Sequence, residues 1–133
     1  MNEKENTELI RSMYAAFGKG NLPAILNSVT DDVDWQTLGP QEIPQAGPHR
    51  GRDQVAKFFE KIAQNYDIQQ FEPREYVAQG DKVVALGYYR GLVRATGRAY
   101  ESEFAMVFNF RNGKVARFRE YADTAAILAA GKK

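Results

Sequence analysis

Apolar residues in the first half of the chain recur every three or four positions, which is the spacing of one face of an α-helix. Two long stretches with this spacing cover Asn6–Lys19 and Asp53–Asn65, and a shorter one covers Leu22–Ser28. Pro23 suits the first turn of the short segment, because the amide that proline lacks has no helical partner there. The sequence therefore predicts three helices that each bury one face.

In the second half the spacing of apolar residues changes to two, as in strands with one buried face. Gly80-Asp81 and Asn112-Gly113 are tight hairpin signals, and 95–98 makes a slightly longer turn. These turns predict an antiparallel meander. Its four strands are expected over Ile68–Ala78, Lys82–Arg94, Ala99–Arg111 and Lys114–Ala122, followed by a closing helix over Asp123–Ala130.

A further strand and a loop are expected between the second and third helices. Val33, Trp35 and Thr37 alternate with polar residues after a turn at 30–32, which predicts a half-buried strand. The segment Leu38–Gly51 is rich in proline and glycine, and these residues argue against a regular element there. We expect this segment to be a loop at the rim of a pocket.

The pocket follows from the order of the elements. Long strands twist and curl, and a curled sheet with helices on its concave side leaves a cavity at one end. The predicted fold class is α+β, with a cone-shaped, curved antiparallel or mixed sheet that the N-terminal helices wrap around an apolar pocket. A length of 133 residues suits one domain over residues 1–133.

Composition excludes several kinds of partner. Eighteen Lys and Arg against seventeen Asp and Glu give a net charge of +1, which is too weak a field to favour nucleic acid or an acidic membrane. The chain has no cysteine and a single histidine, so we expect no disulfide and no metal. No apolar run approaches the ~20 residues of a membrane span, and no secretory signal is present, so we expect a cytoplasmic protein.

Several motifs resemble a known family. The first helix ends in Phe17-Gly18-Lys19-Gly20, the third begins Gly51-Arg52-Asp53-Gln54-Val55-Ala56-Lys57-Phe58-Phe59, and the final hairpin leads to Tyr121-Ala122-Asp123. Together with the Trp35 strand, they resemble the SnoaL-like branch of the nuclear transport factor 2-like, or ketosteroid isomerase-like, superfamily. The resemblance covers nearly the whole chain. Its members include isomerases, polyketide cyclases, epoxide hydrolases and dehydratases, so the fold does not select one activity.

Asp123 is the first candidate for chemistry. The resemblance implies that an aspartate here moves a proton on the carbon next to a carbonyl, and an apolar wall would raise its pKa toward neutrality. Arg119 and Tyr121 share its strand face, because residues two apart point the same way, and either could stabilise charge on oxygen. The alternatives are that Asp123 caps the closing helix and that Arg119 pairs with Glu101 or Glu103.

The wall of the pocket is expected to come from several elements, and each of its residues has a simpler interpretation as core packing. His49 could instead shuttle protons from the loop, or merely be solvated. Trp35 and Tyr14 each have an apolar body and one polar tip that could meet a ligand oxygen. The predicted substrate-binding residues are Tyr14, Phe17, Trp35, His49, Phe59, Met106 and Phe108.

Two departures from the family pattern weaken the prediction of catalysis. Many SnoaL-like sequences have histidine where this chain has Met106, so the partner base of those relatives is missing. The epoxide hydrolases of the superfamily use an Asp-Arg-Asp arrangement. Asp123 and Arg119 are present here, but only Asp34 could stand in for the second aspartate.

These observations leave two hypotheses and a third possibility. The chain is an isomerase, cyclase or hydrolase that acts without a cofactor on a small apolar carbonyl compound, with Asp123 as the acid/base. Alternatively, it binds a small apolar molecule without catalysis. The third possibility is a scaffold protein, since related proteins use the exposed sheet as an interface, and a homodimer through the sheet is expected in any case.

Overall fold

The computed structural model describes residues 2–132, and its elements largely follow the predicted order. The helices are α1 (Glu3–Gly18), α2 (Leu22–Leu26), α3 (Gly51–Asn65) and α4 (Thr124–Gly131). The strands are β1 (Val29–Thr37), β2 (Gly47–Arg50), β3 (Tyr66–Gln79), β4 (Lys82–Val93), β5 (Ala99–Arg111) and β6 (Lys114–Ala122).

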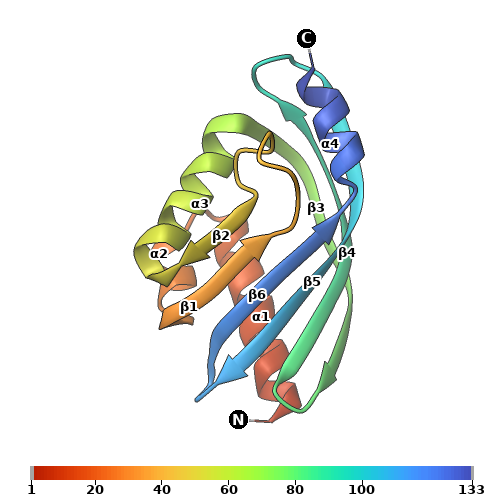
Figure 1. The fold of residues 1–133 in the computed structure, drawn as a ribbon. Coiled ribbons are helices and arrows are strands. Elements are labelled where there is room, and N and C mark those ends of the chain that lie inside the picture. The colour runs from red at the N-terminus through yellow and green to blue at the C-terminus, as the bar shows by residue number, and fades with distance from the viewer. Residues whose placement is uncertain (1, 133) are drawn as a thin grey trace.

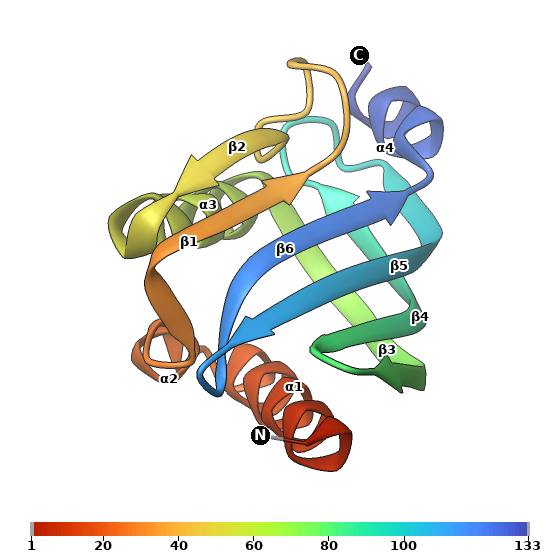
Figure 2. The same cartoon turned by 60° about the horizontal axis from the view of Figure 1, so that its bottom comes forward.

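The strands form one mixed sheet in the order β2-β1-β6-β5-β4-β3. Strands β1 and β6 run parallel, and the other neighbouring pairs run antiparallel. Figures 1 and 2 show the sheet curving around α1, α2 and α3, while α4 lies at one end beside β5. The predicted α+β fold, a curved mixed sheet wrapped by the N-terminal helices, is confirmed.

Two local predictions are wrong. The expected turn at 30–32 belongs to β1, which starts at Val29 and shifts register against β6 between Val29 and Asp34. The expected loop contains β2, in which His49 pairs with Trp35. Because β2 is the edge strand of the sheet, Pro48 needs no partner for the amide it lacks.

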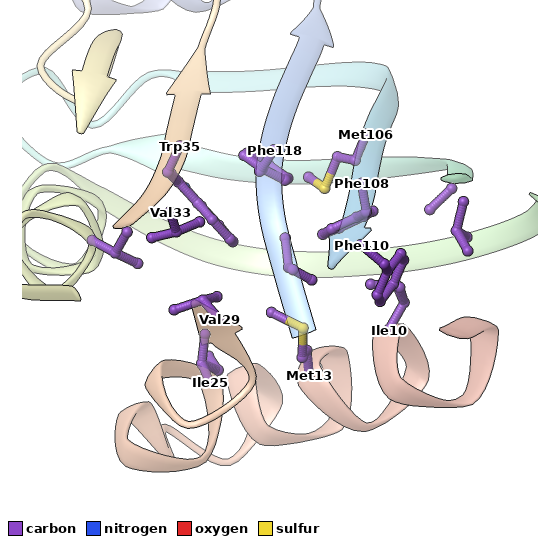
Figure 3. Packing of buried hydrophobic residues seen from close by; sticks show 14 of the residues in the cluster. Ile10, Met13, Ile25, Val29, Val33, Trp35, Met106, Phe108, Phe110 and Phe118 are labelled. Carbon is purple, nitrogen blue, oxygen red and sulfur yellow. The ribbon is translucent and has the colours of Figure 1, made fainter. Parts of the chain in front are cut away.

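The buried face of the sheet forms the main core with the helices. Figure 3 shows Ile10 and Met13 from α1 and Ile25 from α2 facing side chains of the strands. In β5 the buried residues alternate with more exposed ones along the whole strand, as expected for a sheet with one covered face. The labelled strand residues in this core are Val29, Val33, Trp35, Met106, Phe108, Phe110 and Phe118.

A second, smaller cluster seals the end of the molecule near α4. It joins Ile43 of the 38–46 segment to Ile127 and Ala130 of α4, together with Tyr66, Val93 and Tyr100. Thr96 tethers α4 from the β4–β5 turn by donating its hydroxyl to the carbonyl of Ala130, at 2.6 Å. Among residues 2–132, no helix has the length and apolar character needed to cross a membrane.

Strand β3 approaches β4 closely at Gly91. A Cβ atom at this position would lie 2.7 Å from the carbonyl oxygen of Asp67 and 2.7 Å from the hydroxyl oxygen of Tyr100. A backbone carbonyl within a strand pair cannot withdraw without disturbing that pair.

We therefore predict that Gly91→Ala destabilises the protein by about 1–3 kcal/mol, the usual cost of overpacking, measured by urea unfolding. Gly18→Ala is the control, because nothing lies within 4 Å of the added Cβ at the end of α1. That change should be neutral or stabilise by up to ~1 kcal/mol. Equal effects of the two substitutions would contradict the steric explanation.

Candidate functional site

A cavity of about 90 Å³ lies between the concave face of the sheet and the helices. Most of its walls are aromatic rings, and within residues 2–132 its lining holds no lysine, arginine or histidine. Glu120 is the single carboxyl group that the described residues contribute to the lining. The lining residues are Met13, Tyr14, Phe17, Ile25, Trp35, Gln45, Phe58, Phe59, Ile62, Tyr66, Ile68, Phe71, Tyr89, Tyr100, Met106, Phe108, Phe118, Glu120 and Ile127.

Glu120 is held by two hydroxyl groups from two other strands of the sheet, β1 and β4. Thr37 of β1, directly opposite in the parallel pair, donates to Oε1 at 2.9 Å. Tyr89 of β4 donates to Oε2 at 2.8 Å. Only 7% of Glu120 is exposed, and this burial raises the pKa of its carboxyl group, against the opposing effect of the two hydrogen bonds. The group therefore takes up a proton far more readily than an exposed glutamate.

Four tyrosines around Glu120 keep their hydroxyl protons. Burial raises the pKa of Tyr14, Tyr66, Tyr89 and Tyr100, and the nearby charge of Glu120 adds to the rise. The Tyr14 hydroxyl donates to Sδ of Met106 at 3.1 Å. A thioether is a weak acceptor, so this donor can turn to a ligand oxygen at little cost.

The structure places most of the predicted wall residues around the cavity. Tyr14 and Phe17 come from α1, Trp35 from β1, Phe59 from α3, and Met106 with Phe108 from β5. Trp35 stacks on Phe118, with ring centroids 3.9 Å apart, and Figure 3 shows both side chains in the core between β1 and β6. A role of these side chains in substrate binding stays a prediction.

His49 does not line this cavity. Its Nδ1 donates to the carbonyl of Gly47 at 3.1 Å, and its Nε2 accepts from Nζ of Lys61, also at 3.1 Å. Burial, and then the charge of Lys61, lower the pKa of the imidazole. Because only 4% of the residue is exposed, the expectation of a solvated histidine is wrong. A role of His49 in shuttling protons stays a prediction that its position outside the cavity lining does not support. His49 instead fastens β2 to α3.

The expectation that Arg119, Tyr121 and Asp123 line the pocket is also wrong. They share one face as predicted, but it is the outer face of β6. Arg119 donates to Oδ2 of Asp34 at 2.9 Å, and this bond lowers the pKa of Asp34. Tyr121 is 49% exposed, and the side chain of Asp123 caps α4 by accepting from the amide of Ala126 at 3.1 Å.

The error has a structural cause in β6. Phe110 pairs with Val115, but Asn109 pairs with Arg117, so β6 carries one extra residue at Ala116. This bulge reverses the alternation and turns Glu120 inward. A catalytic role for Arg119, Tyr121 and Asp123 remains a prediction for which their position gives no support.

Glu120, Tyr89 and Thr37 were missed by reasoning from the sequence. The predicted alternation of Val33, Trp35 and Thr37 with polar residues already placed Thr37 on the buried face of β1, but its hydrogen bond to Glu120 was not predicted. Glu120 lies two residues after Phe118, so the two side chains point to the same face of β6. Once Phe118 is known to be buried, Glu120 is expected to point inward as well. No residue near Ala116 marks the bulge, because alanine fits either face of a strand.

Comparison with known proteins gives matches along most of the chain. The family model of the SnoaL-like domain matches residues 10–118. An uncharacterized protein of Mycobacterium tuberculosis H37Rv is 26% identical over 127 residues, 95% of each chain. The crystal structure of an NTF2-like protein from Burkholderia xenovorans LB400 is 33% identical, covers 99% of both chains and has a TM-score of 0.91. TerC, co-crystallised with polyporic acid, is 26% identical with a TM-score of 0.85, over 95% of this chain and 97% of TerC.

The burial of Glu120 predicts how the stability depends on pH. Because its folded-state pKa is raised, the folded protein binds a proton that the unfolded chain has already released, so stability falls as the pH rises above the ordinary glutamate value of 4.5. Glu120→Gln removes this titration. As the pH rises, the free energy of unfolding of Glu120→Gln minus that of the wild type should increase by up to ~1.4 kcal/mol per pH unit. The increase should stop once the pH exceeds the folded-state pKa of Glu120.

Urea unfolding of both proteins from pH 4 upward measures this difference, and the comparison at each pH cancels all other titrating groups. Parallel stability curves for the two proteins would show that Glu120 titrates as an exposed carboxyl does.

Proposed function

Because the chain belongs to the SnoaL-like domain family, we propose that its cavity binds a small, uncharged apolar carbonyl compound and that Glu120 moves a proton on it. The observation that carries this proposal is the position of Glu120, a carboxyl group buried in an aromatic cavity with no cation in the lining. A carboxyl whose pKa is shifted toward neutrality is suited to act as both base and acid.

The chemistry needs two groups, and both face the cavity. The carboxylate of Glu120 takes a proton from the carbon next to the carbonyl, so that a C–H bond breaks and an O–H bond forms. Negative charge develops on the carbonyl oxygen, where the Tyr14 hydroxyl donates a hydrogen bond in place of its contact with Met106. Return of the proton to another carbon completes an isomerisation. Alternatively, the carbanion attacks a second carbonyl, a C–C bond forms as the C=O π bond breaks, and Glu120 returns its proton to the alkoxide oxygen, which gives a cyclisation. No cofactor takes part in either route.

The charge of the lining favours an uncharged ligand. An anionic ligand would meet Glu120 and the electron-rich faces of the aromatic rings, with no arginine, lysine or histidine in the lining of the described chain to receive it. The co-crystallisation of TerC with polyporic acid supports an organic small molecule as the type of ligand. The cavity is small, so we infer a compact compound or one that displaces wall side chains.

Exchange of hydrogen for deuterium in phenylacetone tests the proton transfer. This ketone carries an aromatic ring and acidic C–H groups, and proton NMR in D2O follows the loss of the signal. The wild-type protein should accelerate exchange above the buffer rate, and Glu120→Gln should reduce that acceleration by about 100-fold or more. Asp123→Asn is the matched control and should leave it unchanged, because Asp123 lies outside the cavity.

A loss of exchange in Asp123→Asn with normal exchange in Glu120→Gln would return the acid/base role to Asp123.

A second candidate function is binding without catalysis. Both oxygens of Glu120 already accept hydrogen bonds, and Met106 stands where many relatives have histidine, so the carboxyl could serve only to orient a ligand. Trp35 lies in the cavity wall and is the single tryptophan of the chain, so its fluorescence reports binding directly. A change of fluorescence with phenylacetone, without exchange above the buffer rate, would select this function.

We also propose that the outer face of the sheet pairs two copies of the chain. Leu86, Ala105 and Tyr121 are directly opposite one another on β4, β5 and β6. They line a shallow hollow together with charged residues of both signs, Arg74, Glu75 and Glu103. Val77 on β3 is 52% exposed. An apolar strip of this kind on a sheet face suits a second, identical strip, because a twofold pair is self-complementary.

The expected species is a homodimer that Tyr121→Arg converts to a monomer, since two added charges would be buried in one interface. Light scattering during size-exclusion chromatography gives the mass of each species. Glu60→Arg, on the exposed surface of α3, is the control for the added charge and should stay dimeric. A wild-type protein that elutes as a monomer at micromolar concentration would overturn this proposal.

A further inference from the structure

A second hollow, outside the cavity, runs between α1 and β3. Tyr14, Phe17, Ile68 and Phe71 line both this groove and the cavity, so the wall between solvent and cavity is one side chain thick there. The remaining residues of the groove are Arg11, Ala15, Gly18, Gln69, Gln70, Pro73 and Tyr76.

Ring contacts and one cation–π contact, with the Arg11 guanidinium 4.9 Å from the centroid of the Tyr76 ring, hold this wall together. The ring of Phe71 lies 5.3 Å from that of Tyr14 and 5.3 Å from that of Phe17, between centroids. Within the described part of the chain, no hydrogen bond or ion pair connects residues 11–18 of α1 with residues 66–73 of β3. A side chain in such a wall can change rotamer without breaking a directional bond.

The backbone that carries Phe71 is also pliable. Strand β3 is at the edge of the sheet and pairs only with β4. Its register shifts between Ile68 and Gln70 and again between Pro73 and Glu75, so Phe71 stands between two irregularities. Bulges at an edge strand loosen the ladder locally and leave the inner strands intact.

The other boundaries of the cavity are stronger. One side is the hydrogen-bonded sheet itself. The far end is closed by the cluster around Ile127, by the bond from Thr96 to Ala130 at 2.6 Å, and by the amide of Asp123, which donates to Oγ of Ser102 at 2.8 Å. Compared with these two boundaries, the wall at α1 and β3 is held by fewer directional bonds.

We propose that the groove between α1 and β3 is the entrance to the cavity, where a flat, uncharged aromatic molecule first binds, and that Phe71 is the gate that admits it. Tyr76 and Pro73 supply apolar surface for the first contact, and Tyr14 and Phe17 receive the molecule on the inner side. The identity of the ligand as a small apolar molecule rests on the proposed function, but the route does not depend on any catalytic step.

Stopped-flow fluorescence with nitrobenzene tests the entrance. Nitrobenzene is flat, uncharged and quenches indole, so the quenching of Trp35 follows its arrival in the cavity. In Phe71→Ala the association and dissociation rate constants should both rise by about ten-fold or more, because removal of a gate accelerates passage in both directions. Phe59→Ala is the matched control. It also shortens a half-buried phenylalanine of the cavity wall, but one that does not line the groove.

A second variant should slow the passage of the ligand instead of accelerating it. Ala15 is exposed and lines only the groove, so Ala15→Trp should fold normally and slow both rate constants while leaving the equilibrium affinity of the cavity nearly unchanged. Because this variant adds a second tryptophan, the double variant Ala15→Trp/Trp35→Phe is measured as a blank, so that the fluorescence of the new tryptophan can be subtracted.

The outcomes separate the two proposals. Equal rate constants in Phe71→Ala and Phe59→Ala, or an unaltered rate in Ala15→Trp, would overturn the entrance and leave the proposed function standing. Absence of quenching in the wild type together with quenching in Phe71→Ala would show a closed gate and support the entrance. Absence of quenching in every protein would overturn both the entrance and the proposed pocket.

Discussion

The pairing of β5 with β6 decides what the cavity contains. One extra residue at Ala116 reverses the phase of β6, so Phe118 and Glu120 turn inward while Arg119 and Tyr121 turn to the outer face. Without it, a guanidinium and a phenol would face the helices and the carboxyl would lie in solvent. The cavity would then have the opposite charge. The position of a single alanine therefore sets the electrostatic character of the site.

The buried carboxyl carries an energetic cost that the surrounding residues only partly offset. Removing an ionised carboxyl from water costs several kcal/mol, and no cation in the described lining compensates for it. The hydroxyls of Thr37 and Tyr89 bond both oxygens and fix their geometry, but they oppose the effect of burial only in part, so the pKa of the carboxyl stays raised. Natural proteins tolerate such strain mostly where it serves function.

The elements that the sequence predicted well have local causes. The one-sided spacing in α1 and α3 and the Asn112-Gly113 hairpin, whose residues have φ of 53° and 78°, follow from residues close together in the chain. The formation of strand β2 and the choice of which β6 side chains point inward do not follow from residues close together in the chain. Pro48 is compatible with a strand only because β2 lies at the edge, and Glu120 faces inward only because β6 bulges against β5. Both facts depend on the pairing partner, which sequence periodicity cannot supply.

Glu120 is held through its main chain as well as its side chain. Its carbonyl accepts from the amide of Leu38 at 3.1 Å, and Thr37, which bonds its carboxyl, also bridges to Ala46. The segment 38–46 is thus tied down at both ends beside the carboxyl. Insertions, deletions or exchanges between those anchor points would reshape the rim without displacing the carboxyl of Glu120. In evolutionary terms, the shape of the rim and the position of the carboxyl are separable here, and the rim can change by loop variation alone.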